Sequence, residues 1–418
     1  MIQPLRGRIR PVGYFLRGAS QFAAPRTIAA IARFVMGILF AAFERTVAGI
    51  REAVADSPTA SALRQFLGSR ELREKLVTLL RWKTRQNLRK ALRRRGNRTG
   101  SIILAIDSTF KGTLSRRARH LFFPGHGERV GQHIFVCGLL LFPDGTRLPL
   151  GPLQKKGGRH APTQVDLAAV LVRELAPELR RRSVVVVADA FFFAKKFLRA
   201  IRTAGFHYVI ACKGNTVLTD RTPLDSLVRT LRLAASCVTL PARRGERQKT
   251  FSVARRLLGL RCGGTQAVVF SRPHHKRSAR TKFLVSDLQD APAAELVRLY
   301  AHRWQIEVYF REAKSYLGFD QYRVTGEYGP GNFALLVTLA YQFLHWGGAG
   351  TERAQTTLAR IRALTADVAA DNYEVLERAV ATRHRRKKFR ARFHPHAPSS
   401  AHGSRRAKTR IKRIRLAS

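Results

Sequence analysis

The sequence is poor in acidic residues. Asp and Glu number 27 against 77 Lys and Arg, which gives a formal net charge of +50. A chain with this imbalance repels itself strongly unless a polyanion lies on its surface. Nucleic acid is therefore the expected partner, although the charge alone fits a basic ribosomal or nucleoid protein about as well.

Cysteine is scarce and scattered. The four cysteines, Cys137, Cys212, Cys237 and Cys262, form no CxxC pair. Their spacing argues against a zinc site and against a disulfide framework. We expect four small core residues in a reducing compartment.

Long apolar runs are also missing. The longest uncharged apolar run near the N-terminus, residues 34–43, is about half of the roughly 20 residues needed to cross a bilayer. It does not end in a convincing cleavage site, so we expect neither a membrane partner nor a signal peptide. The predicted location is the cytoplasm, with association with the nucleoid when the chain is bound to DNA.

The N-terminal part has a helical pattern. From residue 25 to about residue 95, apolar residues recur three and four positions apart. A basic stretch that contains glycine follows at residues 93–100, and it suits either a linker beside a phosphate backbone or a solvated helix end. We predict a helical DNA-binding region at residues 1–98, in which residues 26–95 and 93–98 are the candidates for reading DNA.

The next part predicts an α/β fold. Three short β-branched runs, at residues 102–106, 133–142 and 147–150, have the look of antiparallel strands. Helices at 165–179 and 194–204 then alternate with strands at 183–188 and 208–212. This order predicts a mixed sheet with helices against it, as in a ribonuclease H-like core whose first part covers residues 99–213.

The second half divides less clearly. Residues 214–281 are irregular, basic and weakly β-patterned, which predicts an inserted β-rich region. The core resumes at residues 282–325 with a strand at 283–285 and one long helix at 294–317. A helical region is expected at 326–382, and the basic tail at 383–418 is expected to be disordered or to fold only on DNA.

Two aspartates directly follow strongly apolar strands. Asp107 stands in Ile-Leu-Ala-Ile-Asp-Ser-Thr and Asp189 in Val-Val-Val-Val-Ala-Asp-Ala. The ends of adjacent strands lie close together in a sheet, so these carboxylates can converge without a local motif. Each can also simply cap the next turn or helix, which is the commoner role of a single strand-end aspartate.

Four polar residues share one face of the long predicted helix. Tyr300, Arg303, Glu307 and Lys314 fall within roughly 60° of arc at 100° per residue. A solvated face with an Arg303–Glu307 pair would give the same pattern. A Tyr beside Arg and Lys, however, can hold a phosphate backbone, and a lone carboxylate among cations suits a metal ligand.

These residues carry a resemblance to a known family. The spacing Tyr-x2-Arg-x3-Glu-x6-Lys resembles the signature of bacterial insertion-sequence transposases of the cut-and-paste type, which have an Asp-Asp-Glu triad and an inserted β domain. Asp107 and Asp189 match the first and second acidic motifs of that family, and the resemblance covers residues 100 to 320 approximately.

The resemblance implies a specific chemistry. Asp107, Asp189 and Glu307 would be catalytic and would hold two Mg²⁺ ions, or Mn²⁺ as a substitute, because carboxylates without His or Cys favour these metals. Phosphodiester hydrolysis at transposon ends and strand transfer into target DNA would follow. Tyr300, Arg303 and Lys314 would bind DNA, and a homodimer would join the inverted-repeat ends.

Some assignments stay open. Many members of the family flip a base against an aromatic side chain, but neither Trp82, Trp304 nor Trp346 can be assigned to this step from the sequence. Another ribonuclease H-like nuclease, or a repurposed transposase that only binds DNA, would share much of the pattern. Further basic groups that could touch DNA are Lys111, Lys155, Lys156, Arg159, Lys213, His274, His275 and Lys276.

Overall fold

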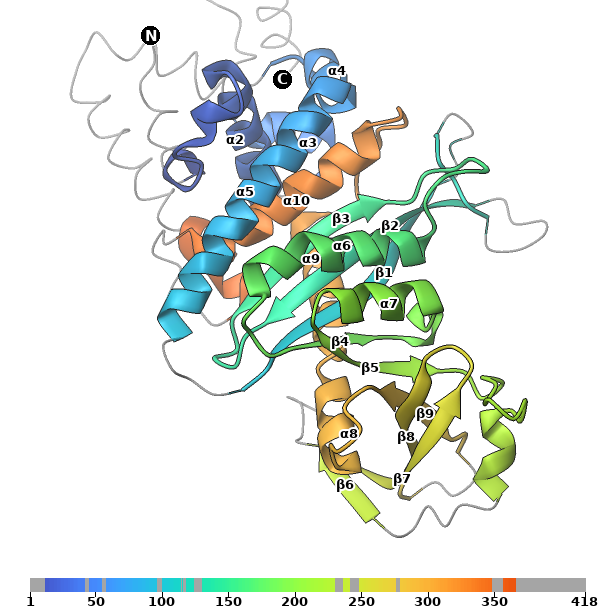
Figure 1. The fold of residues 1–418 in the computed structure, drawn as a ribbon. Coiled ribbons are helices and arrows are strands. Elements are labelled where there is room, and N and C mark those ends of the chain that lie inside the picture. The colour runs from blue at the N-terminus through green and yellow to red at the C-terminus, as the bar shows by residue number, and fades with distance from the viewer. Residues whose placement is uncertain are drawn as a thin grey trace, which may run out of the picture.

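The computed structural model describes residues 12–41, 45–54, 58–95, 100–113, 115, 118–123, 130–229, 236–240, 248–275, 279–347 and 356–365. Figure 1 shows a mixed α/β protein built around one long sheet, with helices gathered at one end of it and a β-rich part at the other. The predicted basic tail, residues 96–99 and Lys276 lie outside the described residues.

The sheet has nine strands in the order β3-β2-β1-β4-β5-β9-β8-β7-β6. Its first five strands are β1 (Ile102–Thr113), β2 (Gly131–Leu141), β3 (Arg147–Gln154), β4 (Val184–Ala188) and β5 (His207–Cys212). The pairs β1–β2 and β2–β3 are antiparallel, whereas β4 runs parallel to both β1 and β5. The predicted mixed α/β sheet is therefore confirmed.

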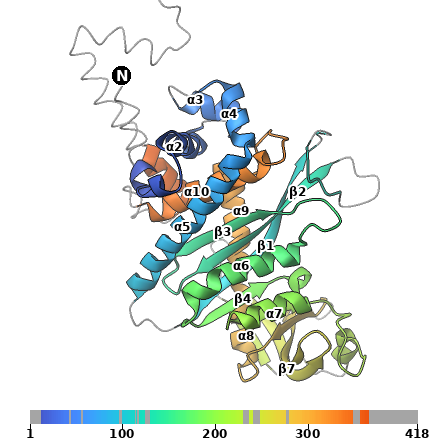
Figure 2. The same cartoon turned by 45° about the horizontal axis from the view of Figure 1, so that its top comes forward.

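Helices cover this sheet because its central strands are apolar on both faces. Every residue of β4 is buried, as expected of a parallel strand between two layers. On one face α6 (Gln164–Leu179) contacts β2 and β3, and α7 (Lys195–Thr203) contacts β5. In Figures 1 and 2, α9 (Trp304–Leu317) passes along the opposite face, where it contacts β1 and β2.

The region predicted to be inserted extends the same sheet. It contains β6 (Ser236–Leu240), β7 (Lys249–Leu260) and β8 (Gly264–Pro273), and it is followed by β9 (Lys282–Ser286), the strand predicted to resume the core. Strand β9 pairs with β5 on one side and with β8 on the other, both antiparallel. Backbone pairing therefore continues without a break from the core strands into the β-rich part.

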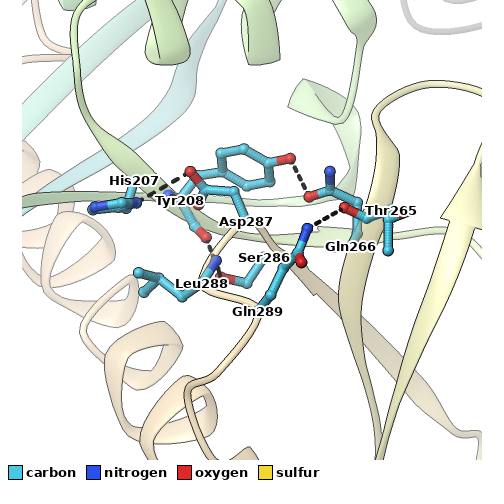
Figure 3. Close-up of polar contacts among 8 residues, drawn as sticks. All are labelled: His207, Tyr208, Thr265, Gln266, Ser286, Asp287, Leu288 and Gln289. Atoms are coloured by element: carbon cyan, nitrogen blue, oxygen red, sulfur yellow. Dashed lines mark hydrogen bonds and ion pairs between the residues drawn. The ribbon is translucent and has the colours of Figure 1, made fainter.

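Polar side chains fix the junction of β5 and β9 (Figure 3). The backbone N–H of Tyr208 donates to Oδ1 of Asp287 at 2.9 Å, and Oδ2 of Asp287 lies 3.2 Å from Nδ1 of His207. The hydroxyl of Ser286 donates to the carbonyl of Tyr208 at 2.7 Å. The hydroxyl of Tyr208 donates in turn to Gln266 of β8, so one cluster ties three strands together.

The predicted N-terminal helices are present: α2 (Pro25–Phe40), α3 (Val47–Ala53), α4 (Ala60–Gly68) and α5 (Arg70–Arg95). Three of them, α2, α4 and α5, contact α10 (Gly329–Trp346), whose residues are nearly all buried. Arg81, Arg85 and Arg89 of α5 pair with Glu174 and Glu178 of α6. This arginine face of α5 is therefore engaged within the protein.

The prediction of a single helix at residues 294–317 is wrong. This segment forms two helices, α8 (Ala293–Ala301) and α9, with His302 and Arg303 between them. The N–H of Arg303 donates to the carbonyl of Tyr300 at 2.9 Å, and that of Ile306 to the carbonyl of Arg303 at 3.2 Å. These hydrogen bonds between residues three apart tighten the chain and interrupt the α-helix at this point.

The cysteine prediction holds only in part. Cys137 and Cys212 are buried and Cys262 is half-buried, but Cys237 is exposed on edge strand β6. Its Sγ lies 3.3 Å from Nδ1 of His274. All four cysteines are free. In the described part of the chain, we find no helix with the length and apolar character needed to span a bilayer.

Candidate active site

Asp107 lies at the point where β1 loses its parallel neighbour. Strand β4 pairs with β1 only as far as Ile106, whereas β2 accompanies β1 to its end. Oδ1 of Asp107 accepts a hydrogen bond from the N–H of Ser108 at 2.8 Å. The side chain is only 14% exposed, so its surroundings control its charge.

The electrostatics of Asp107 are unusual. The pKa of its carboxyl is raised to about 6, and burial is the largest cause. The negative charges of Asp189 and Glu307 also raise this pKa, while the Ser108 N–H and the charge of Arg303 lower it. The other two carboxylates predicted from the sequence therefore lie near enough to act on Asp107.

Asp189 lies at the corresponding end of the neighbouring strand. Ile106 of β1 is in register with Ala188 of β4 in a parallel pair, so Asp107 and Asp189 are the next residues along each strand. Oδ1 of Asp189 also accepts a hydrogen bond from the N–H of Phe191 at 3.0 Å. One oxygen thus caps the short helical turn at Ala190–Phe192, while the carboxylate lies beside Asp107.

Glu307 and Arg303 come from the start of α9. Nη1 of Arg303 donates to Oδ2 of Asp107 at 2.7 Å, and Nη2 of the same guanidinium donates to Oε1 of Glu307. Burial opposes the charge of Arg303, but Tyr300, Asp107 and Glu307 raise its pKa. Arg303 therefore joins the first and third predicted carboxylates, an arrangement that the helix pattern did not predict.

The other two residues of the predicted row lie on either side. Tyr300 belongs to α8, and burial raises the pKa of its hydroxyl, which the charge of Arg303 lowers. Lys314 belongs to α9, and its Nζ donates to the carbonyl of Phe110 at 3.2 Å and lies 5.3 Å from the centre of that ring. The row thus spans two helices, with Arg303 at their join.

The donor set suits a cation. Asp107 and Glu307 already share one positive group, the guanidinium of Arg303. Three carboxylates without His or Cys favour hard divalent ions such as Mg²⁺. Within the described ranges, no three His, Cys, Asp or Glu side chains are gathered closely enough to hold a metal ion as they stand. The chemistry of the residues fits a metal, and Arg303 lies between two of them.

Two exposed aromatic side chains beside the carboxylates were not predicted. Phe110 on β1 is 55% exposed and Phe191, two residues after Asp189, is 52% exposed. The available sequence signal was a large apolar residue soon after each strand-end aspartate. Of the tryptophans considered, Trp346 is buried, and Trp82 packs at 5.5 Å against Phe22.

Four of the eight additional basic candidates have neighbouring groups as partners. Nζ of Lys111 donates to the carbonyl of Tyr322, Nζ of Lys155 lies 4.0 Å from the ring centre of Phe122, and Lys156 pairs with Glu327 at 3.5 Å. Nδ1 of His274 lies 2.9 Å from Oγ of Ser252. The candidates with exposed side chains include Arg159, Lys213 and His275.

Comparison with known proteins decides the family. The family described as "Transposase DDE domain" matches residues 98–343, which is more than half of the chain. The chain belongs to the DDE transposase family. The resemblance drawn from Asp107, Asp189 and the Tyr-Arg-Glu-Lys spacing is thereby confirmed at the level of the family, and the matched segment ends within α10.

A curated relative points the same way. The chain is 26% identical over 227 residues to a protein named "Probable transposase for insertion sequence element IS5377" from Geobacillus stearothermophilus. The match covers 53% of this chain and 51% of the relative, so the chain spans about half the length of the curated relative it matches.

One solved structure matches the chain at a low level of similarity. The cryo-EM structure of the piggyBac transposase synaptic complex with hairpin DNA matches with a TM-score of 0.47 and 11% identity, over 97% of this chain and 87% of that chain. A similarity at this level adds nothing to the assignment of individual residues.

Proposed function

We propose that this DDE transposase cuts and joins DNA with Asp107, Asp189 and Glu307 as its catalytic carboxylates. The observation that carries the proposal is their placement: Asp107 and Asp189 directly follow two residues that are paired between β1 and β4, and the guanidinium of Arg303 donates to both Asp107 and Glu307. Like charges that lie close together destabilise a fold, so a cluster of carboxylates usually has a function. Cleavage of phosphodiester bonds would be that function here.

The proposed fold of the core supports this assignment. Three antiparallel strands, β1 to β3, are followed by β4 and β5 parallel to β1, the arrangement expected of a ribonuclease H-like core. Its two parts would be residues 99–213 and 282–325, separated by the β-rich region at 214–281. Residues 1–98 would form the DNA-binding helical region, and 326–382 the C-terminal helical region.

The three carboxylates would hold two Mg²⁺ ions, with Mn²⁺ as a possible substitute. When bound, the ions supply Lewis acidity for the attacking and leaving oxygens of the phosphodiester. The protein's own contribution would be placement: the middle of β1, the residue after β4 and the first turn of α9 would supply the three carboxylates.

Tyr300, Arg303 and Lys314 would hold the DNA strand near the cut. A guanidinium, an ammonium and a phenol can position phosphate oxygens without reading sequence. In the proposed sequence of reactions, water cleaves at the element end and frees a 3′ hydroxyl, which then attacks target DNA. A homodimer would bring two inverted-repeat ends together.

The test uses purified full-length protein, DNA carrying the inverted repeats that flank its gene, and Mg²⁺. Wild type should nick at the element boundary, and Glu307→Gln and Asp189→Asn should not. Glu295→Gln, which removes an exposed carboxylate from α8, is the matched control and should cut normally.

Other outcomes point to the alternatives. Cutting that ignores the inverted repeats would indicate a different nuclease of this fold. Specific binding to the repeats without cutting by any variant would indicate a DNA-binding protein derived from a transposase, and cutting by Glu307→Gln would remove Glu307 from the site.

A further inference from the structure

Arg303 occupies the place where a cation is expected. Its Nη1 donates to Asp107 at 2.7 Å and its Nη2 donates to Glu307, so one guanidinium uses oxygens of two proposed metal ligands. The side chain is 19% exposed. The resemblance assigned Arg303 to DNA, and the sequence left open an Arg303–Glu307 pair, but neither predicted a bond to Asp107.

We propose that Arg303 is a latch that couples metal binding to DNA binding. Without DNA, its guanidinium holds Asp107 and Glu307 and weakens their binding of a divalent ion. A DNA phosphate offers the guanidinium another partner, and its departure opens the carboxylates to metal. The inference rests on the proposed function, because it requires these carboxylates to be the metal ligands.

The physical basis is competition for the same oxygens. A divalent ion at Asp107 and Glu307 would lie near the positive charge of Arg303, and like charges repel strongly where water is scarce. Arg binds carboxylate and phosphate with similar fork-shaped geometry, so a DNA phosphate can replace the carboxylates as its partner.

The backbone around Arg303 suits this exchange. Its N–H is bonded to the carbonyl of Tyr300 at 2.9 Å within the tight turn between α8 and α9. The main chain is therefore fixed while the long side chain can move between partners. Lys314, on the same helix, is anchored separately to the carbonyl of Phe110.

Linkage makes the latch measurable. If DNA strengthens metal binding by releasing Arg303, metal must strengthen DNA binding by the same factor. Such couplings are typically between about 5-fold and 150-fold. Removal of the guanidinium should abolish this part of the coupling and should make metal binding tighter in the absence of DNA.

The experiment titrates full-length protein with Mn²⁺ and follows free Mn²⁺ by electron paramagnetic resonance. Without DNA, Arg303→Gln should bind Mn²⁺ at least about fivefold more tightly than wild type, and Arg303→Lys should be intermediate because it keeps the charge but makes fewer bonds. Arg311→Gln, an exposed arginine on the same helix, controls for net charge and should match wild type.

A duplex without the element ends then supplies phosphates without a cleavage site. It should tighten Mn²⁺ binding by wild type and by Arg311→Gln, and it should have little effect on Arg303→Gln. Equal or weaker Mn²⁺ binding by Arg303→Gln in the absence of DNA would overturn the latch. A loss of structure cannot produce the expected gain in affinity.

Glu307→Gln separates this inference from the proposed function. If Glu307→Gln weakens Mn²⁺ binding while Arg303→Gln leaves it unchanged, the metal site stands and the latch is rejected. If Glu307→Gln also leaves Mn²⁺ binding unchanged, the carboxylates are not the metal ligands and the proposed function fails with the latch.

Discussion

Two aspartates that follow buried strands have opposite electrostatic roles. Asp189 follows Val-Val-Val-Val-Ala and Asp287 follows Phe-Leu-Val-Ser, and both lie directly after the end of a strand. Asp287 uses one oxygen for the N–H of Tyr208 and the other for the ring of His207 (Figure 3). Asp189 caps a turn through Oδ1 and lies beside a second carboxylate, Asp107.

The difference shows that the same fold uses a carboxylate to stabilise the β5–β9 junction and keeps several carboxylates close together near Asp107. At the β5–β9 junction, the carboxylate satisfies a backbone donor and a side chain that its own strand pairing brings near. Where the pairing of β1 with β4 ends, burial and, to a smaller extent, the charges of Asp189 and Glu307 raise the pKa of Asp107 to about 6. Stored charge of this kind is typical of functional sites.

The largest expected effect comes from neutralising each aspartate in turn, which tests whether only Asp189 takes part in cleavage. Asp189→Asn should reduce cleavage of element-end DNA at least about 100-fold, because metal ligands supply several kcal/mol and each 1.4 kcal/mol is about tenfold. Asp287→Asn should stay within about threefold of wild type. Gel assays of end cleavage under identical salt and Mg²⁺ decide between them, and equal losses would show that Asp287 also belongs to the site.

For stability, in contrast to cleavage, Asp287 should matter more than Asp189. Asp287→Ala removes the acceptor of the Tyr208 N–H and the partner of His207, and should lower the free energy of unfolding by about 2 kcal/mol, as for hydrogen bonds to a charged group. Urea denaturation followed by circular dichroism measures the change. Asp290→Ala, three residues further along and exposed, should change the stability by less than about 0.5 kcal/mol; a similar loss there would deny Asp287 its special role.

The sequence predicted the strands that hold the site better than it predicted their lengths. Asp107 and Asp189 were found because each ends an apolar run, and parallel pairing of β1 with β4 brings such ends together. The first strand was predicted to end at residue 106, but β1 continues to Thr113. Beyond Ile106 it pairs only with β2, so its residues need not be apolar there.

Other features leave no mark in the apolar pattern. The break between α8 and α9 keeps the helical spacing of Tyr300, Arg303 and Glu307, so periodicity cannot distinguish it from one long helix. The continuity of β9 with β5 depends on backbone groups, which every residue carries. The position of Arg303 between two carboxylates required the fold itself.

The third prediction concerns the cost of the stored charge. Since the pKa of Asp107 is raised to about 6 from 3.8, the folded state keeps a proton that the unfolded state releases, and metal-free protein loses stability as pH rises from about 4 to about 6. At a side chain 14% exposed, we expect a loss of about 1 to 2 kcal/mol after solvent screening.

Comparison with Asp107→Asn isolates this contribution. In chelator-treated samples, the stability difference between the variant and wild type should shift in favour of the variant from pH 4 to pH 7. Asp290→Asn should show no such trend. A difference that is constant with pH would mean that Asp107 titrates normally and that its site stores no charge.

The smallest expected effect concerns DNA binding by two lysines, one near the carboxylates and one near the β5–β9 junction. Lys314 of α9 donates to the carbonyl of Phe110 in β1, whereas Lys213 directly follows β5 and is exposed. If Lys314 contacts a phosphate, Lys314→Gln should weaken DNA binding several-fold and lower the slope of log K against log salt by about 0.9. Lys213→Gln should leave the slope unchanged, because the β5–β9 junction is not expected to meet the cut strand. Fluorescence anisotropy from low to moderate salt measures both slopes, and a larger change for Lys213→Gln would move the DNA path from the carboxylates to the junction.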